Sequence, residues 1–278
     1  MNRENRMIGM IVPTMDNPFF ASLACEVEAC LSGRQYGLLL CSSANDAERE
    51  KAYFRMLAEK GAAGILCVSG LSALPDGLLP EDYPLVWLDR RPESARPVPW
   101  VANDDAAATE EATAYLLEKG CKDILLLPGF LAEHQESPRV AGYRAALERY
   151  GVAFREEYVL RRGGKKSSEA ETEELLLALL KNGDAIDGVI ASSDRSAFGA
   201  MTALRKVGRY VPEDVKLICF DNSPYSTMAS PSVTALDRNP RLLAERACET
   251  LLRILGGSAA TEEKTLVPVS LVQRDSTR

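Results

Sequence analysis

Polar and charged side chains gather where the apolar runs of this sequence end. The candidates for chemistry are Asp16, Asn17, Ser69, Asp89, Arg90, Arg139, Ser193, Asp194, Asp221 and Asn222. Carboxylates accept hydrogen bonds from hydroxyl groups, and guanidinium groups offer forked donors. Two adjacent rings, Phe19 and Phe20, could add a flat apolar wall. This inventory suits the binding of a small polyhydroxylated or anionic molecule.

Each of these residues also has a simpler interpretation. An aspartate at the end of a strand often forms a turn or caps a helix. The "DRR" at 89–91 could equally be an ion-pair cluster on the surface. We interpret the one histidine, His134 in "LAEHQESPR", and the densest basic stretch, "RRGGKK" at 161–166, as parts of solvated loops.

Sequence motifs of enzymes are mostly missing. The chain has no G-x-S-x-G nucleophile elbow, no phosphate-binding G-x-x-x-x-G-K-[ST], and no G-x-G-x-x-G after a strand. It also lacks H-E-x-x-H and EF-hand spacing, so we expect no metal and no cofactor. The enzymatic alternative that remains is an acid–base pair formed by Asp89 and Asp221.

Composition narrows the class of protein. The chain has 278 residues, of which 46% are hydrophobic and 26% charged, with a formal net charge of −7. No Lys/Arg run is long enough for a nucleic-acid arm, and no apolar run is long enough to span a membrane. A secretory signal is not visible, and the seven cysteines lack C-x-x-C spacing. We therefore expect a cytoplasmic protein whose cysteines are mostly small buried hydrophobes.

Short apolar runs alternate with amphipathic stretches along the chain, which is typical of an α/β fold with parallel sheets. The predicted strands are 8–12, 37–41, 64–68, 85–88, 123–127, 188–191 and 216–220. The predicted helices are 19–32, 48–60, 105–119, 139–150, 168–181 and 197–207. The two halves of the chain repeat this pattern loosely, which predicts two similar units. Because ligands bind beyond the carboxyl ends of parallel strands, the candidate residues would line one shared cleft.

An ordered set of motifs resembles the effector-binding part of LacI/GalR-type bacterial transcriptional regulators. The set begins with "IGMIVPTMDNPFFASLACEVEACLSGRQYGLLLCSSAND" and continues with "GAAGILCVSG", "PLVWLDRR", "VANDDAAATEEATAYLLEKGCKDILLLPG" and "RVAGYRAAL". It ends with "GVIASSDRSAFGAMTALRKVGRYVPEDVKLICFDNSP", "PSVTALDRNP" and "LVQRDST". Together these motifs cover about residues 7–277.

The resemblance implies a periplasmic-binding-protein-like fold of type I, with two doubly wound parallel-sheet subdomains around a ligand cleft. We expect an N-terminal subdomain of residues 7–103 plus 238–266 and a C-terminal subdomain of 104–237 plus 267–278. Three crossovers near 102–104, 236–240 and 265–269 would join them.

Regulators of this kind are dimers in which a small effector changes how an attached helix-turn-helix domain fits its operator DNA. That domain is absent from this chain. We interpret the chain as a fragment of a longer regulator, with a natural sensor-only protein as the alternative.

The resemblance also assigns ligand-binding residues. Arg139, three residues before Gly142-Tyr143, matches the effector-contacting arginine of the family. Asp89 and Asp221 match common acceptors of ligand hydroxyl groups. Asp16, Asn17 and Phe19 would line the cleft after the first strand, joined by Ser69 and Arg90, while Phe20 is expected in the core.

Three positions depart from the family pattern. Ser193 stands where many members have asparagine, so its shorter side chain weakens that expected contact. Asn103 replaces a residue that is aromatic in some sugar binders, and Arg238 replaces a frequent glutamine. We nevertheless include all three among the predicted ligand-binding residues.

The leading hypothesis is a dimeric, cytoplasmic effector sensor of a LacI-type repressor that binds a sugar, a sugar acid or a phosphosugar. The three arginines at 90, 139 and 238 favour an anionic ligand, but a neutral sugar fits equally well. The first alternative is a stand-alone solute-binding protein of a transport system. The second is the enzyme that would use Asp89 and Asp221.

Overall fold

A computed structural model describes residues 6–129, 137–163, 167–183 and 185–278. His134 and residues 164–166 of the basic stretch lie outside the described residues. The chain divides into two compact units, which we call unit 1 and unit 2. Unit 1 holds the described residues up to Asn103 together with Asn239–Val267, and unit 2 holds the described part of 104–238 together with Pro268–Arg278. In the described part of the chain, the backbone passes between the units after residues 103, 238 and 267.

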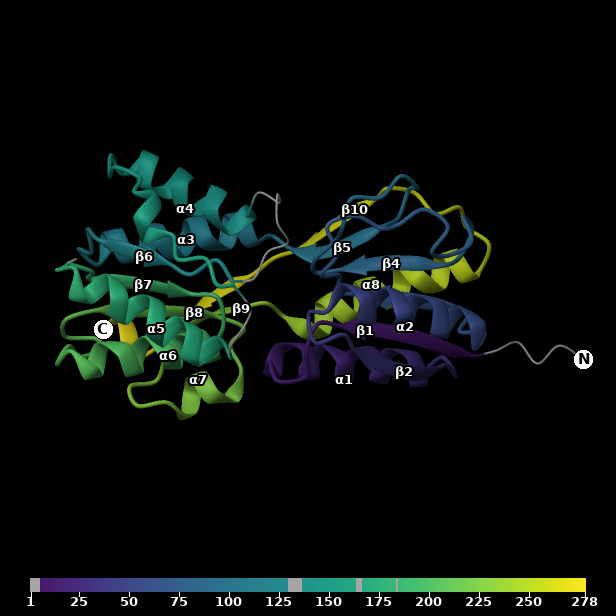
Figure 1. Cartoon of the computed structure of the whole chain (residues 1–278), viewed down its shortest axis with the longest axis horizontal. Helices are drawn as coiled ribbons and strands as arrows, with labels where there is room; N and C mark the ends of the chain where they lie inside the picture. The colour runs from purple at the N-terminus through teal and green to yellow at the C-terminus, as the bar shows by residue number, and fades with distance from the viewer. Residues whose placement is uncertain (1–5, 130–136, 164–166, 184) are drawn as a thin grey trace, which may run out of the picture. The chain divides into compact units, whose positions relative to one another are not determined.

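Unit 1 is built on a parallel sheet (Figure 1). Its strands are β1 (Met7–Val12), β2 (Gly37–Ser42), β3 (Gly64–Cys67), β4 (Leu85–Leu88), β5 (Trp100–Asn103) and β10 (Lys264–Val267), in the order β10-β5-β4-β3-β1-β2. The helices are α1 (Pro18–Ser32), α2 (Ala47–Glu59) and α8 (Pro240–Leu255).

Side-chain alternation along β1 shows how this sheet is covered on both faces. Ile8 and Met10 join a buried cluster that includes residues of α1 and α8, while Ile11 points into a second cluster with residues of α2. Successive side chains of a strand point to opposite faces, so one apolar run serves both cores.

Unit 2 has a similar sheet of β6 (Ile124–Leu126), β7 (Gly188–Ala191), β8 (Lys216–Phe220), β9 (Thr234–Asp237) and β11 (Ser270–Val272), in the order β11-β9-β8-β7-β6. β11 is antiparallel to β9, and the other pairs are parallel. Its helices are α3 (Asp105–Glu118), α4 (Pro138–Arg149), α5 (Ser168–Lys181), α6 (Asp194–Lys206) and the short α7 (Pro224–Met228). Residues of α3 and α4 share one buried cluster with the sheet, and residues of α5 and α6 share another.

Two glycines let the helix pairs of unit 2 pack closely. A Cβ placed on Gly142 of α4 would lie 2.0 Å from the carbonyl oxygen of Ala106 in α3. A Cβ on Gly199 of α6 would lie 2.3 Å from the carbonyl oxygen of Glu169 in α5. Both helix crossings therefore bring backbone against backbone, which only glycine permits.

Candidate ligand-binding site

The carboxyl ends of neighbouring strands bring four predicted residues of unit 1 together, namely Ser69, Asp89, Arg90 and Asn103. Ser69, Asp89 and Asn103 follow or end β3, β4 and β5, which are adjacent in the sheet. The backbone N–H of Ser69 donates to the carbonyl oxygen of Arg90 at 3.3 Å. The side-chain amide of Asn103, which is buried, donates to the carbonyl oxygen of Val267 at 3.4 Å. Unit 1 thus gathers polar groups at one edge of its sheet, as the sequence predicts.

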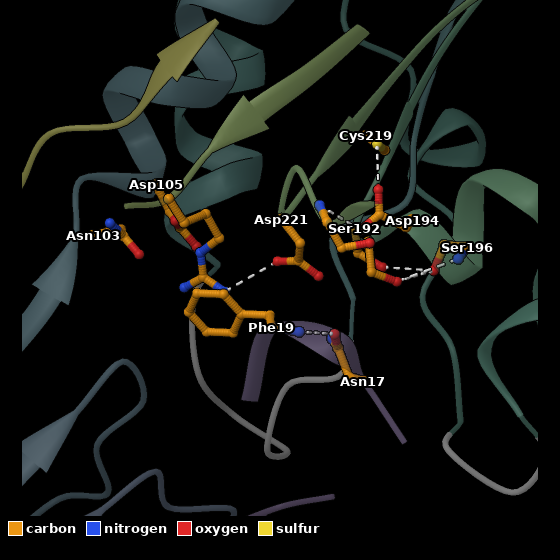
Figure 2. Close-up of polar contacts among 12 residues, drawn as sticks. Asn17, Phe19, Asn103, Asp105, Ser192, Asp194, Ser196, Cys219 and Asp221 are labelled. Atoms are coloured by element: carbon orange, nitrogen blue, oxygen red, sulfur yellow. Dashed lines mark hydrogen bonds and ion pairs between the residues drawn. The ribbon is translucent and has the colours of Figure 1, made fainter. Parts of the chain in front are cut away.

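The loop after β1 places the other predicted residues of unit 1. Asp16 is exposed, and Asn17 caps α1 by accepting from the backbone N–H of Phe19 at 2.9 Å (Figure 2). The rings of Phe19 and Phe20 lie 5.3 Å apart in an edge-to-face arrangement, and both belong to the core of unit 1. The prediction that Phe20 is a core residue is confirmed. That Phe19, Asp16 and Asn17 bind a ligand stays a prediction.

Two aspartates occupy corresponding places in the two sheets. Asp89 follows β4 and Asp221 follows β8, and each of these strands is third in its sheet when counted from β10 or β11. Both residues have a left-handed backbone, with φ of +63° and +94°. Such a conformation is unfavourable for a residue with a Cβ and persists only where the surroundings hold it. At Asp89 the indole N–H of Trp100 donates to the backbone carbonyl at 3.0 Å.

Arg139 lies at the carboxyl ends of the strands of unit 2. Its Nε donates to Asp105 Oδ2 at 2.8 Å, and its guanidinium carbon lies 3.7 Å from the centre of the Phe220 ring. One terminal nitrogen also donates to the carbonyl oxygens of Pro128 and Ser192 at 3.3 Å. The arginine is therefore fixed beside the turns that follow β6 and β7 and beside the last residue of β8.

Ser193 and Asp221 belong to the same edge. The Ser193 hydroxyl caps α6 by accepting from the backbone N–H of Ser196 at 3.2 Å, and Ser192 shares a hydrogen bond with the Ser196 hydroxyl at 2.9 Å (Figure 2). Asp221 Oδ1 lies 3.5 Å from a guanidinium nitrogen of Arg238, and both side chains are buried. Unit 2 therefore brings Arg139, Ser193, Asp221 and Arg238 to one edge of its sheet.

Sequence reasoning missed a charged cluster at this edge. The cluster consists of three arginines and three acidic residues: Arg139, Arg162, Arg195, Asp105, Glu169 and Glu171. Arg162 was expected in a solvated loop, and that prediction is wrong, because its side chain is 11% exposed and donates to Ser168 Oγ at 2.6 Å. The signal was hidden because a buried and a solvated arginine look alike in a run of basic residues. The helical pattern that begins at Ser168 could have indicated that Glu171 lies beside Arg162.

A scan against protein-family models matches residues 113–277 to the periplasmic binding protein-like domain. The ribose operon repressor of Halalkalibacterium halodurans is 30% identical over 278 residues, an alignment that covers 100% of this chain and 81% of that protein. The chain belongs to the LacI family of transcriptional regulators.

Two further relatives extend this LacI-family membership. The HTH-type transcriptional repressor PurR of Vibrio campbellii is 32% identical over 250 residues, which are 89% of this chain and 74% of that one. A solved structure of a periplasmic binding protein/LacI transcriptional regulator from Alkaliphilus metalliredigens QYMF, complexed with D-xylulofuranose, matches with a TM-score of 0.82 at 25% identity. That match covers 98% of this chain and 99% of the other.

The expected family and fold are thereby confirmed. These three relatives are regulators and not enzymes. In the described residues of this LacI-family chain, no helix combines the length and apolar character needed to cross a membrane. The same residues contain no group of three or more His, Cys, Asp or Glu side chains that could hold a metal ion.

Proposed function

We propose that the chain is the effector-sensing and dimerisation part of a LacI-type transcriptional regulator, and that it binds a small sugar or sugar-like metabolite. The observation that carries the proposal is the position of Arg139. This arginine is held by Asp105 and stacked on Phe220, so that it lies at the carboxyl ends of three parallel strands. Ligands of open α/β sheets bind at such carboxyl ends.

The relatives support a sugar as the effector. One of them is named a ribose operon repressor, and a similar solved structure holds D-xylulofuranose. Pairs of carboxylates and arginines at a strand edge recognise hydroxyl groups by accepting and donating hydrogen bonds. The polar residues at the sheet edges of both units provide such groups.

Regulation would follow from differential affinity. An effector that binds one arrangement of a dimeric regulator more tightly shifts the population toward that arrangement. A helix-turn-helix domain attached to the chain would then fit its operator better or worse. In this proposal the protein acts in the cytoplasm and catalyses no reaction.

A thermal-shift screen tests the proposal. The panel contains D-ribose, D-xylulose, other neutral sugars, their phosphorylated forms, their sugar acids, and purines. A ligand that binds only the folded state raises the melting temperature by mass action. We expect a shift with at least one sugar or sugar derivative. If only purines, or none of these compounds, shift the melting temperature, the proposed sugar-sensing function is wrong.

Arg139→Ala tests the location of the site. Because hydrogen bonds to charged groups contribute about 1.5–3 kcal/mol, the variant should bind the effector more than about tenfold more weakly. The matched control is Arg149→Ala, on the same helix α4, whose ion pair with Glu110 is exposed. Unchanged effector affinity in a folded Arg139→Ala variant would show that Arg139 is not part of the site.

A further inference from the structure

The charged cluster of unit 2 is balanced within itself. Arg195 Nε lies 2.6 Å from Glu169 Oε1, in addition to the 2.8 Å pair of Arg139 and Asp105. Arg162 lies 4.0 Å from Glu171 Oε2, and Glu171 Oε1 accepts from the backbone N–H of Gly163 at 3.0 Å. Each of the three guanidinium groups therefore has a carboxylate of its own.

Electrostatic interactions link Arg162 to four other members of the cluster. Burial lowers the pKa of Arg162, an effect that Glu171 and Glu169 oppose and that Arg139 and Arg195 reinforce. Burial acts to raise the pKa of Glu169, but hydrogen bonds, above all from Arg195, lower it below its ordinary value. The carboxylate of Glu169 therefore stays ionised at neutral pH and keeps its share of the charge balance.

Buried polar atoms without a hydrogen-bond partner concentrate in and beside this cluster. Six such side-chain atoms occur in the described residues, and five of them are Asp105 Oδ1, Glu169 Oε2, Arg162 Nε, Ser137 Oγ and Thr172 Oγ1. Ser137 precedes α4, and Thr172 lies one turn after Glu169 in α5. Native structures leave few buried polar groups unpaired, so such a concentration indicates a place that a polar ligand or water completes.

The unpaired atoms include both hydrogen-bond donors and hydrogen-bond acceptors. Asp105 and Glu169 offer acceptor oxygens, Arg162 offers a donor, and the hydroxyls of Ser137 and Thr172 can do either. A sugar hydroxyl donates one hydrogen bond and accepts others, so it can satisfy both kinds. A phosphate or carboxylate only accepts, and it would meet the like charge of Asp105 and Glu169.

We propose that the charged cluster is a subsite for the hydroxyl groups of a neutral sugar, and that Glu169 sets the preference for neutral over anionic ligands. The inference rests on the proposed function and chooses among its ligand classes. An anionic ligand would have to draw a guanidinium away from its carboxylate. At Asp105 and Glu171, whose side chains are 14% and 12% exposed, this would leave a largely buried carboxylate without its partner, which is costly.

Isothermal titration calorimetry with matched ligand pairs tests the inference. D-Ribose and D-xylulose are each compared with their phosphorylated form and with the corresponding sugar acid. We expect the neutral member of a pair to bind at least about tenfold more tightly. This difference corresponds to one charge-assisted hydrogen bond that the anionic member would disrupt. Tighter binding of an anionic member would overturn the inference and leave the proposed function standing. If no sugar derivative binds, the proposed function is wrong, and so is the inference that rests on it.

Glu169→Gln isolates the role of the carboxylate. Removing this charge leaves Arg195 without its anion, so the ratio of neutral to anionic affinity should fall by about tenfold. The control is Glu173→Gln, which removes another ion pair between α5 and α6, that of Glu173 with Lys206. A purely structural role of Glu169 would weaken both members of a pair alike. If the ratio is unchanged in a folded Glu169→Gln protein, the inference is wrong.

Discussion

In each unit, a carboxylate buried in the first turn of a helix holds the end of a strand. In unit 1, Glu50 accepts from Ser69 Oγ at 2.5 Å, from the Gly70 N–H at 2.8 Å and from the Cys67 thiol at 3.8 Å. In unit 2, Asp194 accepts from the Ser223 N–H at 3.1 Å and from the Cys219 thiol at 3.4 Å (Figure 2). Both acidic side chains belong to residues that are 1% exposed.

The difference between the units lies in what surrounds this shared arrangement. Burial raises the pKa of Glu50 and of Asp194, and hydrogen bonds from the turns they hold oppose the rise. Unit 2 adds the charged cluster of six residues, whereas in unit 1 the nearby charge that acts on Glu50 is that of Arg90. The strand ends are thus held by Glu50 and Asp194 in both units, and the charged cluster is an addition of unit 2.

The largest expected effect concerns helix packing, which also differs between the units. Helices α1 and α8 of unit 1 contain no glycine, whereas α4 of unit 2 crosses α3 at Gly142. Gly142→Ala should lower the free energy of unfolding by about 3 kcal/mol, because the added Cβ overlaps the Ala106 carbonyl oxygen. Urea denaturation measures this loss.

The matched control is Gly33→Ala at the end of α1. A Cβ there would lie 3.7 Å from its nearest neighbour, and the backbone φ of −60° suits alanine. We expect a change of less than about 1 kcal/mol, toward higher stability. Equal losses in the two variants would show that close backbone contact does not distinguish the units.

The next largest effect is expected from removing the buried carboxylates of Glu50 and Asp194. Glu50→Ala leaves the partly buried backbone N–H of Gly70 without its acceptor, and Asp194→Ala does the same to the buried N–H of Ser223. Each variant should lose about 2 kcal/mol of unfolding free energy in urea denaturation. Asp46→Ala, which removes an exposed helix cap of α2, should lose about 1 kcal/mol. A loss in only one of the two carboxylate variants would end the parallel between the units.

The pH dependence of stability should have the same sign at both carboxylates. A raised pKa means that the folded state binds the proton more tightly than the unfolded chain. The unfolding free energy therefore falls as pH rises above about 4.5 at Glu50, or above about 3.8 at Asp194, toward the folded pKa.

Comparison with amide variants isolates these contributions. As the pH rises from about 3.8 toward neutrality, the wild type should lose unfolding free energy relative to Glu50→Gln and to Asp194→Asn, because only the wild-type carboxyl groups have a raised pKa. Denaturation at several pH values provides the measurement. A wild type whose stability rises relative to both variants over this range would contradict the raised pKa values.

The smallest expected effect concerns Asp89, where two substitutions distinguish the cost of the backbone conformation from the loss of the side chain. Asp89→Gly and Asp89→Ala both remove the carboxylate, but only glycine adopts a φ of +63° without strain. The glycine variant should therefore be more stable than the alanine variant by about 0.5–1 kcal/mol. The same pair at Asp221 should show the same order. An alanine variant as stable as glycine at either position would mean that the turn relaxes freely.

Much of the fold could be predicted from the sequence, because the central strands are buried on both faces and appear as continuous apolar runs. Four strands, β5, β9, β10 and β11, were missed. β5 and β9 are mostly buried, but each has only four residues and ends in a polar one. β10 and β11 are short and partly exposed, with mixed polar and apolar residues. Helix α8 was also missed, although Leu243, Ala247 and Leu251 recur at helical spacing and are fully buried. There the periodic signal was present and was not used.

The candidate site was harder to predict, because its interactions join residues distant in sequence. Asp89 and Arg139 could be named from their local motifs. The pairing of Arg195 with Glu169, and the burial of Glu50 beneath Ser69, depend on helices packing together and leave no local pattern. The exposure of Cys25 could likewise not be predicted, because its sequence context resembles that of the buried Cys67 and Cys219.

The order in which the chain visits the two units has a consequence for its synthesis. The strands β1–β5 of unit 1 are complete at Asn103, but the core that they share with α8 requires residues up to Leu255. Unit 2 in turn waits for Arg274 and Ser276, which bond to Asn222 and Thr234. Unit 1 therefore cannot complete this core before Leu255 is available, and unit 2 cannot complete these contacts before Ser276 is available. Each unit is thus made of segments far apart in the sequence, and its first strands are synthesised well before the segments that complete their packing.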